Sequence, residues 1–171
     1  MRRIGLLSDT HSHWDERYAK YFGSCDEIWH AGDIGSMTVA DGLAGIAPLK
    51  AVYGNIDTTA IRREYPLVQR FMCEGVDVLM KHIGGYPGKY DRSVIRYLYP
   101  HNDENGKLVP APKLFISGHS HILKVMMDDK LGCLHINPGA AGLYGQQAVR
   151  TLIRFNIDGP DIKDLEVIEL Y

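Results

Sequence analysis

The sequence lacks several features that would define its class at once. No stretch approaches the ~18 continuous apolar residues of a membrane span. The apolar run near the N-terminus ends at Ser8, which makes it shorter than the ~7–15-residue core of a signal peptide. There are only three cysteines, without a Cys-x-x-Cys pair: Cys25, Cys73 and Cys133. This odd, widely spaced set excludes a disulfide framework and a zinc-thiolate cage, so we expect a cytoplasmic protein without a membrane partner.

The chain also lacks an excess of charge of either sign. Nineteen Lys and Arg residues face 21 Asp and Glu residues, and the net charge is −2. A basic surface for nucleic acid is therefore not indicated. With 45% hydrophobic and 23% charged residues, the composition is that of a globular protein and excludes disorder and coiled coils. A length of 171 residues predicts a single domain over 1–171.

The first third of the chain alternates apolar runs with helical segments. Short apolar runs that end in polar residues predict strands at 4–8, 27–30 and 49–53. Segments with few helix breakers predict helices at 14–22 and between Ser36, a residue type that favours the N-cap, and Pro48. A β-α-β-α-β order is typical of a parallel sheet with helices packed on it.

The remainder is richer in strands. The Glu74-Gly75 pair predicts a hairpin between strands 67–73 and 76–82. A short helix is predicted at 93–99, between the loops 84–91 and 101–112, and further strands at 114–117, 122–128, 133–136, 149–157 and 163–170. We therefore predict an α/β fold in which two mixed β-sheets pack face to face as a sandwich flanked by helices.

Polar motifs follow four of the predicted strands, and His82 ends the second arm of the hairpin. The motifs are Asp9-Thr10-His11, Gly32-Asp33, Gly54-Asn55-Ile56-Asp57 and Gly118-His119-Ser120-His121. Alone, the first three motifs and His82 are weak signals, because such residues commonly form turns and a lone histidine is commonly part of a core. Only Gly118-His119-Ser120-His121 is moderately specific by itself. Together they collect Asp, Asn and His at strand ends, and these ligand types suit Mn²⁺, Zn²⁺, iron or Ni²⁺.

In this order the motifs resemble those of the calcineurin-like metallophosphoesterases, and especially their small single-domain prokaryotic phosphodiesterases. The resemblance extends from Ile4 to Gly139. It implies a four-layer αββα fold and two divalent ions, with manganese expected first and zinc, iron, nickel or magnesium as alternatives. It also implies one ion held by Asp9, His11, Asp33 and His121 and a second held by Asp33, Asn55, His82 and His119, so that Asp33 bridges them.

The resemblance further implies a function. A hydroxide that bridges the two ions would hydrolyse a small phosphoester, most naturally a phosphodiester. In this interpretation Asp9, Asp33, Asn55 and His82 act in catalysis by holding the ions. Two alternatives stay open: a phosphomonoesterase or nucleotidase that uses the same site, and a binding module with the same fold and little activity. A homo-oligomer is compatible with the sequence.

Two positions depart from the family pattern. Ile56 stands where many members have a histidine that is thought to protonate the leaving group, and Ala140 stands where the family has a serine. His13, two residues after His11, is the substitute acid that we predict. Substrate contacts are predicted for Asn55, His13, Lys89 and Arg92. Of the other histidines, His30 and His135 are expected to be structural and His101 to be solvated.

Overall fold

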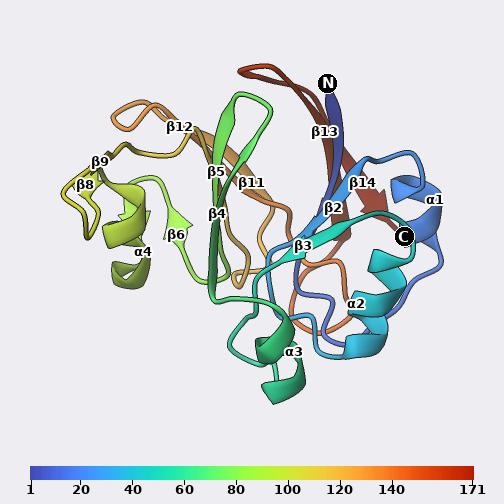
Figure 1. Ribbon diagram of the computed structural model, residues 1–171. Coiled ribbons are helices and arrows are strands. Elements are labelled where there is room, and N and C mark those ends of the chain that lie inside the picture. The colour runs from blue at the N-terminus through green and yellow to red at the C-terminus, as the bar shows by residue number, and fades with distance from the viewer.

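Two five-stranded sheets form the body of the protein in the computed structural model, which describes residues 1–171 (Figure 1). The first sheet has the order β14-β13-β1-β2-β3. Its strands are β1 (Arg2–Leu7), β2 (Glu27–His30), β3 (Leu49–Ala51), β13 (Arg150–Asp158) and β14 (Asp161–Leu170). The second sheet has the order β11-β12-β10-β5-β4. Its strands are β4 (Val68–Cys73), β5 (Val76–Lys81), β10 (Leu114–Ile116), β11 (Lys124–Asp128) and β12 (Cys133–Asn137).

Helices cover the outer faces of the sandwich. They are α1 (Arg17–Phe22), α2 (Met37–Ala44), α3 (Thr59–Glu64) and α4 (Arg92–Leu98). Figure 1 shows α1 and α2 beside the first sheet and α4 at the opposite side of the molecule. The longest of them, α2, has eight residues, and no helix could cross a membrane.

Successive side chains of a strand point to opposite faces of its sheet, and the buried residues form three apolar cores. Leu6 and Trp29 face the second sheet, whereas Leu7 and Ile28 face α1 and α2. The third core lies between the second sheet and α4, where Leu79 packs with residues of that helix. The four layers, helix, sheet, sheet and helix, confirm the predicted fold.

Gly5 permits the close packing of α1 on β1. A Cβ atom at this position would lie 2.5 Å from the Phe22 ring, which is nearer than any real contact of this kind. The absence of a side chain therefore lets Phe22, which is completely buried, rest directly on the strand.

Several predicted elements differ in their limits. The strand predicted at 27–30 is β2, but α1 begins only at Arg17, because the Asp15 carboxylate accepts hydrogen bonds from the Arg17 backbone and guanidinium in a turn. Helix α3 was not predicted, since its six residues bury only Ile61 and show no apolar period. Ser36 occupies the N-cap of α2, but its side chain makes no capping hydrogen bond.

The two predicted loops also contain short strands. The first holds the hairpin β6 (Gly85–Tyr86) and β7 (Lys89–Tyr90). The second holds β8 (His101–Asn102) and β9 (Leu108–Val109). Two-residue strands carry no readable alternation, which is why the sequence did not reveal them.

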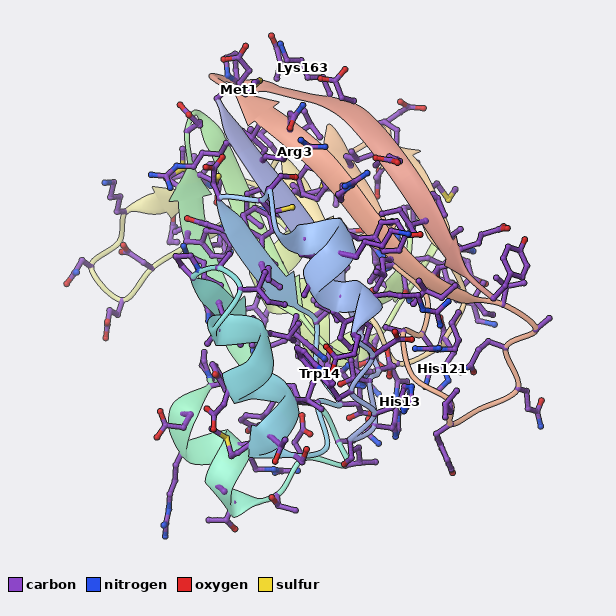
Figure 2. All side chains as sticks on the ribbon, turned by 90° about the vertical axis from the view of Figure 1, so that its right-hand side faces the viewer. Met1, Arg3, His13, Trp14, His121 and Lys163 are labelled. Carbon is purple, nitrogen blue, oxygen red and sulfur yellow. The ribbon has the colours of Figure 1, made fainter.

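The parallel strands gather their carboxyl ends at one end of the sandwich. Strands β1, β2 and β3 run parallel in the first sheet, as do β5, β10 and β12 in the second. The polar motifs follow these strands directly. Figure 2 shows His121, His13 and Trp14 at this end and Met1 and Lys163 at the other.

Candidate metal centre

Two groups of potential metal ligands lie side by side at these strand ends. The first contains Asp9, His11 and His121, and the second contains Asp33, His82 and His119. Within each group, the ligand atoms lie within 4.8 Å of one another. Strands of both sheets contribute, since Asp9 follows β1 whereas His119 and His121 follow β10.

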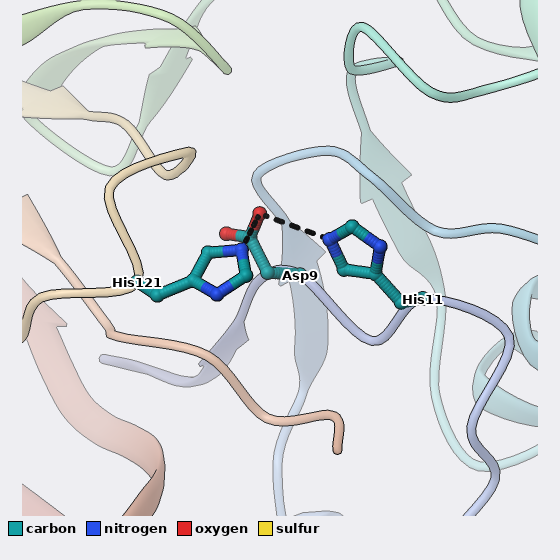
Figure 3. A group of neighbouring side chains, drawn as sticks. All are labelled: Asp9, His11 and His121. Atoms are coloured by element: carbon teal, nitrogen blue, oxygen red, sulfur yellow. Dashed lines mark ion pairs between the residues drawn. The ribbon is translucent and has the colours of Figure 1, made fainter. Parts of the chain in front are cut away.

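Asp9 is the centre of the first group (Figure 3). Its Oδ1 atom lies 3.2 Å from His121 Nε2 and 3.7 Å from His11 Nε2. Its Oδ2 atom accepts hydrogen bonds from the Ser8 hydroxyl at 2.6 Å and from the His119 backbone N–H at 3.1 Å. One carboxylate oxygen is therefore held by the fold, and the other faces the histidines.

Asp33 lies between the two groups. Its Oδ2 atom is 3.2 Å from His82 Nε2 and 3.4 Å from His11 Nε2. Its Oδ1 atom accepts a hydrogen bond from the Ile56 backbone N–H at 3.1 Å. On the other side, Asn55 Oδ1 lies 3.1 Å from His119 Nδ1. All seven predicted ligands thus lie close together, and Asp33 Oδ2 lies near a histidine of each group.

Three buried ligand atoms have no hydrogen-bond partner: Asp9 Oδ1, His11 Nε2 and His82 Nε2. An unsatisfied buried polar atom costs about 1–3 kcal/mol, so three together indicate that another group completes the site. The Nδ1 atom of His82 donates to the Ala31 carbonyl at 2.7 Å, which directs its Nε2 lone pair at the carboxylates. Carboxylate and imidazole ligands in this arrangement fit divalent ions.

The backbone at the ligands is strained. Asp9, His11, Asp33, His119 and His121 have positive φ angles between 44° and 70°. Residues with a Cβ adopt this region at a cost, and such residues concentrate at functional sites. Two motif glycines make room for the carboxylates, because a Cβ at Gly54 would overlap Asp33 and one at Gly118 would overlap Ser8 and Asp9.

Burial and nearby charges shift the pKa values of these ligands in opposite directions. Burial disfavours ionisation of Asp9, but its close contacts with His11 and His121 and the charge of His82 lower its pKa below the usual range. The close contact with the Asp9 carboxylate raises the pKa of His121 against the effect of burial. For His82, burial lowers the pKa, yet its contacts with Asp33 and Asp9 raise it overall. The pocket thus favours anionic carboxylates, as cation binding requires.

Gln147, which lies outside every sequence motif, binds His121. Its amide nitrogen donates to the carbonyls of Gly142 and Tyr144 at 3.1 and 2.9 Å. Its Oε1 must then accept from His121 Nδ1, at 3.0 Å. The His121 proton is thereby placed on Nδ1, and its Nε2 lone pair faces Asp9. From the same loop, the Tyr144 ring stacks on His11 with 4.8 Å between centroids.

His30 is a further positioning residue, and it is completely buried. Its Nδ1 accepts from the Gly32 N–H at 3.0 Å, so Nε2 donates to Thr10 Oγ1 at 3.0 Å. The Thr10 hydroxyl in turn donates to the Ile34 carbonyl at 2.8 Å. Burial lowers the pKa of His30 to about 4, which keeps this imidazole neutral as it connects the loops after β1 and β2.

Two of the cavities that adjoin the ligands are both lined in part by His119 and Ser120. The larger holds about 570 Å³ and is lined by His11, Asp33, Asn55, Ile56, His119, Ser120, His121, Ile122, Tyr144, Gln146 and Gln147. The smaller holds about 370 Å³ and includes Tyr86, Lys89 and Asp91. Lys89, for which the sequence predicts a substrate contact, thus lines the smaller cavity.

Two other predicted site residues lie elsewhere. His13 lines neither cavity; burial and then the charge of Arg150 lower its pKa, which disfavours the proton that a general acid needs. Arg92 is exposed at the start of α4 and also lines neither cavity. The geometry does not bring either of them to the ligands. His135 is buried beside Ser117, and His101 is half-buried in β8.

Comparison with known proteins decides the family. The model of the calcineurin-like phosphoesterase superfamily domain matches residues 1–159. The chain belongs to this superfamily. A probable metallophosphoesterase of Methanothermobacter thermautotrophicus is 31% identical over 144 residues, which cover 80% of this chain and 76% of that protein. A second one, from Methanocaldococcus jannaschii, is 32% identical over 146 residues, which cover 80% and 67%.

Solved structures share the fold of this superfamily member at lower identity. Vps29 of Chaetomium thermophilum superposes with a TM-score of 0.73 at 13% identity, over 99% of this chain and 97% of that one. Yfce, a phosphoesterase from E. coli, superposes with a TM-score of 0.59 at 16% identity, over 96% and 98%. At these identities the likeness concerns the fold alone.

Proposed function

We propose that this metallophosphoesterase hydrolyses phosphodiesters and requires two divalent metal ions held by the seven ligand residues. The observation that carries the proposal is the position of Asp33 Oδ2, which lies within 3.4 Å of a histidine from each ligand group. A carboxylate that faces both groups in this way could help to hold both ions.

The chain prepares the site for an anionic substrate. When bound, the two ions supply positive charge and an acidified water. Asp9 and Asp33 bring two negative charges against the four positive charges of two divalent ions, so the site as a whole attracts phosphate. Gln147 and the Ala31 carbonyl hold His121 and His82 in the tautomers that present Nε2 to the ions.

The two cavities support a diester in preference to a monoester. A phosphodiester carries an organic group on each side of the phosphorus, whereas a monoester carries one. The larger cavity offers Ile56, Ile122 and Tyr144 to one group, and the smaller offers Lys89 and Tyr86 to the other. Because the cavities meet at His119 and Ser120, a phosphate at the ligands would direct one substituent into each.

The larger cavity offers little acid catalysis to a leaving group. Ile56 has no proton to give, and Tyr144 is the one titratable residue in the lining apart from the ligands. General-acid help is worth about 10²–10⁴-fold in rate. We therefore expect a strong preference for diesters with good leaving groups.

The test combines metal content with a pair of substrates. We would strip the protein of metal, reload it with Mn²⁺, Zn²⁺, Fe²⁺, Ni²⁺ or Mg²⁺, and measure bound metal together with hydrolysis of bis(4-nitrophenyl) phosphate and 4-nitrophenyl phosphate. The expected result is two ions per chain and faster diester hydrolysis. Asp33→Asn should lose both ions, and Asn55→Ala should weaken one.

Each other outcome has a clear meaning. Full activity in the stripped protein, or retention of both ions by Asp33→Asn, would contradict the proposal. Faster hydrolysis of the monoester would favour a phosphomonoesterase or nucleotidase. Two bound ions without hydrolysis of either ester would favour a binding module.

A further inference from the structure

The smaller cavity beside His119 contains two charged side chains that are not metal ligands. Lys89 and Asp91 both line it. The larger cavity has no charged residue in its lining apart from the ligands themselves. The two substituents of a phosphodiester would therefore meet different surroundings, one apolar and one able to form hydrogen bonds with charged groups.

Asp91 is held in one position at the smaller cavity. Its backbone N–H donates a hydrogen bond to the Gly84 carbonyl at 3.0 Å. Its Oδ1 atom accepts hydrogen bonds from the backbone N–H and the hydroxyl of Ser93, at 2.9 and 2.5 Å. Lys81 Nζ donates to the same Ser93 hydroxyl at 2.8 Å, so the hydroxyl proton is left for Asp91. Asp91 Oδ2 makes no hydrogen bond within the chain, which leaves this oxygen to a ligand.

Two hydrogen-bond donors line the same cavity. Lys89 is exposed, and its ammonium group makes no hydrogen bond or ion pair. The Ser120 hydroxyl accepts hydrogen bonds from Asn137 Nδ2 at 3.0 Å and from the Ile122 N–H at 3.2 Å, so its own proton is free to be donated. A hydroxyl group of a ligand both donates and accepts, and it could therefore pair with Asp91 and with either donor.

The charges around this cavity disfavour an ionic substituent. The hydrogen bonds from Ser93 hold the pKa of Asp91 below its usual value, so this carboxylate would repel a carboxylate or a further phosphate. A quaternary ammonium group would meet the positive charge of Lys89. It would also meet Lys124, whose ammonium lies 3.7 Å from the centre of the Tyr86 ring and occupies one face of it. A neutral group with hydroxyls avoids both repulsions.

We propose that the smaller cavity binds a neutral, hydroxyl-bearing substituent of the substrate, such as a glycerol or sugar group, and that Asp91 and Lys89 determine this specificity. The inference rests on the proposed function, since the phosphate lies at the metal ligands and the substituent beside His119. Asp91 Oδ2 accepts a hydrogen bond from one hydroxyl, and Lys89 Nζ donates to a neighbouring one. The cavity volume of about 370 Å³ is at the lower end of the ~300–1,000 Å³ of small-molecule sites, which suits a small substituent.

The test measures binding, so it does not depend on hydrolysis. Metal-loaded protein would be titrated in a calorimeter with phosphomonoesters of similar size: glycerol 3-phosphate, propyl phosphate, phosphocholine and 3-phosphoglycerate. Phosphorus NMR would check that the esters stay intact. Glycerol 3-phosphate should bind at least ~10-fold more tightly than propyl phosphate, because the propyl chain leaves the polar groups of the cavity unpaired. It should also bind more tightly than the cationic and the anionic ester.

Asp91→Asn separates specificity from a structural role. Asp91 is the N-cap of α4, and asparagine caps a helix as well as aspartate does. The asparagine Oδ1 can keep the bonds from Ser93, whereas a donor replaces the acceptor Oδ2. The preference for glycerol 3-phosphate over propyl phosphate should therefore fall at least ~5-fold, and Lys89→Met should lower it as well. Asp103→Asn is the matched control, because Asp103 Oδ1 also accepts two backbone hydrogen bonds but does not line this cavity.

The outcomes distinguish this inference from the proposed function. Equal affinities for glycerol 3-phosphate and propyl phosphate, or a wild-type preference in both Asp91→Asn and Lys89→Met, would overturn the inference and leave diester hydrolysis untouched. Tighter binding of phosphocholine or 3-phosphoglycerate would overturn it too. A lack of affinity for every ester would contradict phosphate binding at the ligands, and with it both proposals. If Asp91→Asn did not fold, the exposed Lys89→Met variant would decide the comparison.

Discussion

Replacing Asp57 by alanine should both destabilise the protein and disturb the ligand loops. The carboxylate is only 3% exposed. It accepts hydrogen bonds from the backbone N–H groups of Gly35 and Gly54 at 2.8 Å each and of Ile34 at 3.2 Å. It therefore joins the loop after β2, which carries Asp33, to its own loop after β3, which carries Asn55.

The expected loss of unfolding free energy is about 4 kcal/mol. Hydrogen bonds to a charged group contribute ~1.5–3 kcal/mol each, which sums to roughly 5–9 kcal/mol for three. Water that enters beside half-buried Gly35 should satisfy part of what the carboxylate leaves behind. The bonds from Ile34 and Gly54 are buried and account for most of the loss. Urea unfolding followed by circular dichroism in metal-free buffer would measure it.

Asp103→Ala is the matched control. Asp103 also accepts two backbone hydrogen bonds, from Asn105 and Lys107, but in an exposed turn. It should cost less than about 1 kcal/mol, because water replaces the lost partner. Metal affinity should fall in Asp57→Ala and not in Asp103→Ala. Equal, small losses of stability in both variants would refute the role assigned to Asp57.

Three further predictions concern titration, metal binding and catalysis. Burial lowers the pKa of His135 to about 4. Between pH 6.5 and 4 the unfolded chain therefore binds a proton at this histidine and the folded chain does not. The free energy of unfolding should thus decrease as the pH falls from 6.5 towards 4. That loss is roughly 3 kcal/mol, and His135→Gln should remove it from acid-unfolding curves. Gln147→Met should weaken the binding of one ion by about 10–100-fold in titration calorimetry, because His121 loses the acceptor that fixes its tautomer. A plot of log kcat/KM against leaving-group pKa should be steep in the wild type. The slope should be steeper still in Tyr144→Phe only if the Tyr144 hydroxyl donates a proton to the leaving group.

Each of these three predictions could be contradicted by one result. An unchanged acid-unfolding curve in His135→Gln would show that this imidazole does not titrate with unfolding. Unchanged affinity for both ions in Gln147→Met, compared with the wild type, would show that His121 needs no acceptor at Nδ1. A shallow slope that survives Tyr144→Phe would show that another residue protonates the leaving group.

The metal ligands could be predicted from the sequence because each is part of a short motif after a strand. Asp9 and His11 are two residues apart, as are His119 and His121, so these pairs of ligand types can be recognised in the sequence alone. The strands themselves could be predicted because alternation such as that of Leu6 and Leu7 reports two buried faces. These signals are local, and they determined both the sandwich and the types of ligand.

Contacts between residues that are distant in the chain could not be found in this way. Gln147 bonds to a histidine 26 residues away, and Asp57 bonds to N–H groups 22 and 23 residues away. Gln147 lies outside every motif, and the motif that contains Asp57 does not show which N–H groups its carboxylate binds. His13 shows the converse, since it is two residues from His11 in the sequence but does not line either cavity.

The sequence by itself thus determined which residue types stand at the strand ends and which runs become strands. Only the tertiary structure decided that Asp33 lies between the two histidine groups, that five ligands adopt positive φ angles, and that β11 is left at an uncovered edge. The physical reason is that motifs and alternation are properties of neighbouring residues. Ligand distances, backbone strain and strand order are instead set by how two sheets pack.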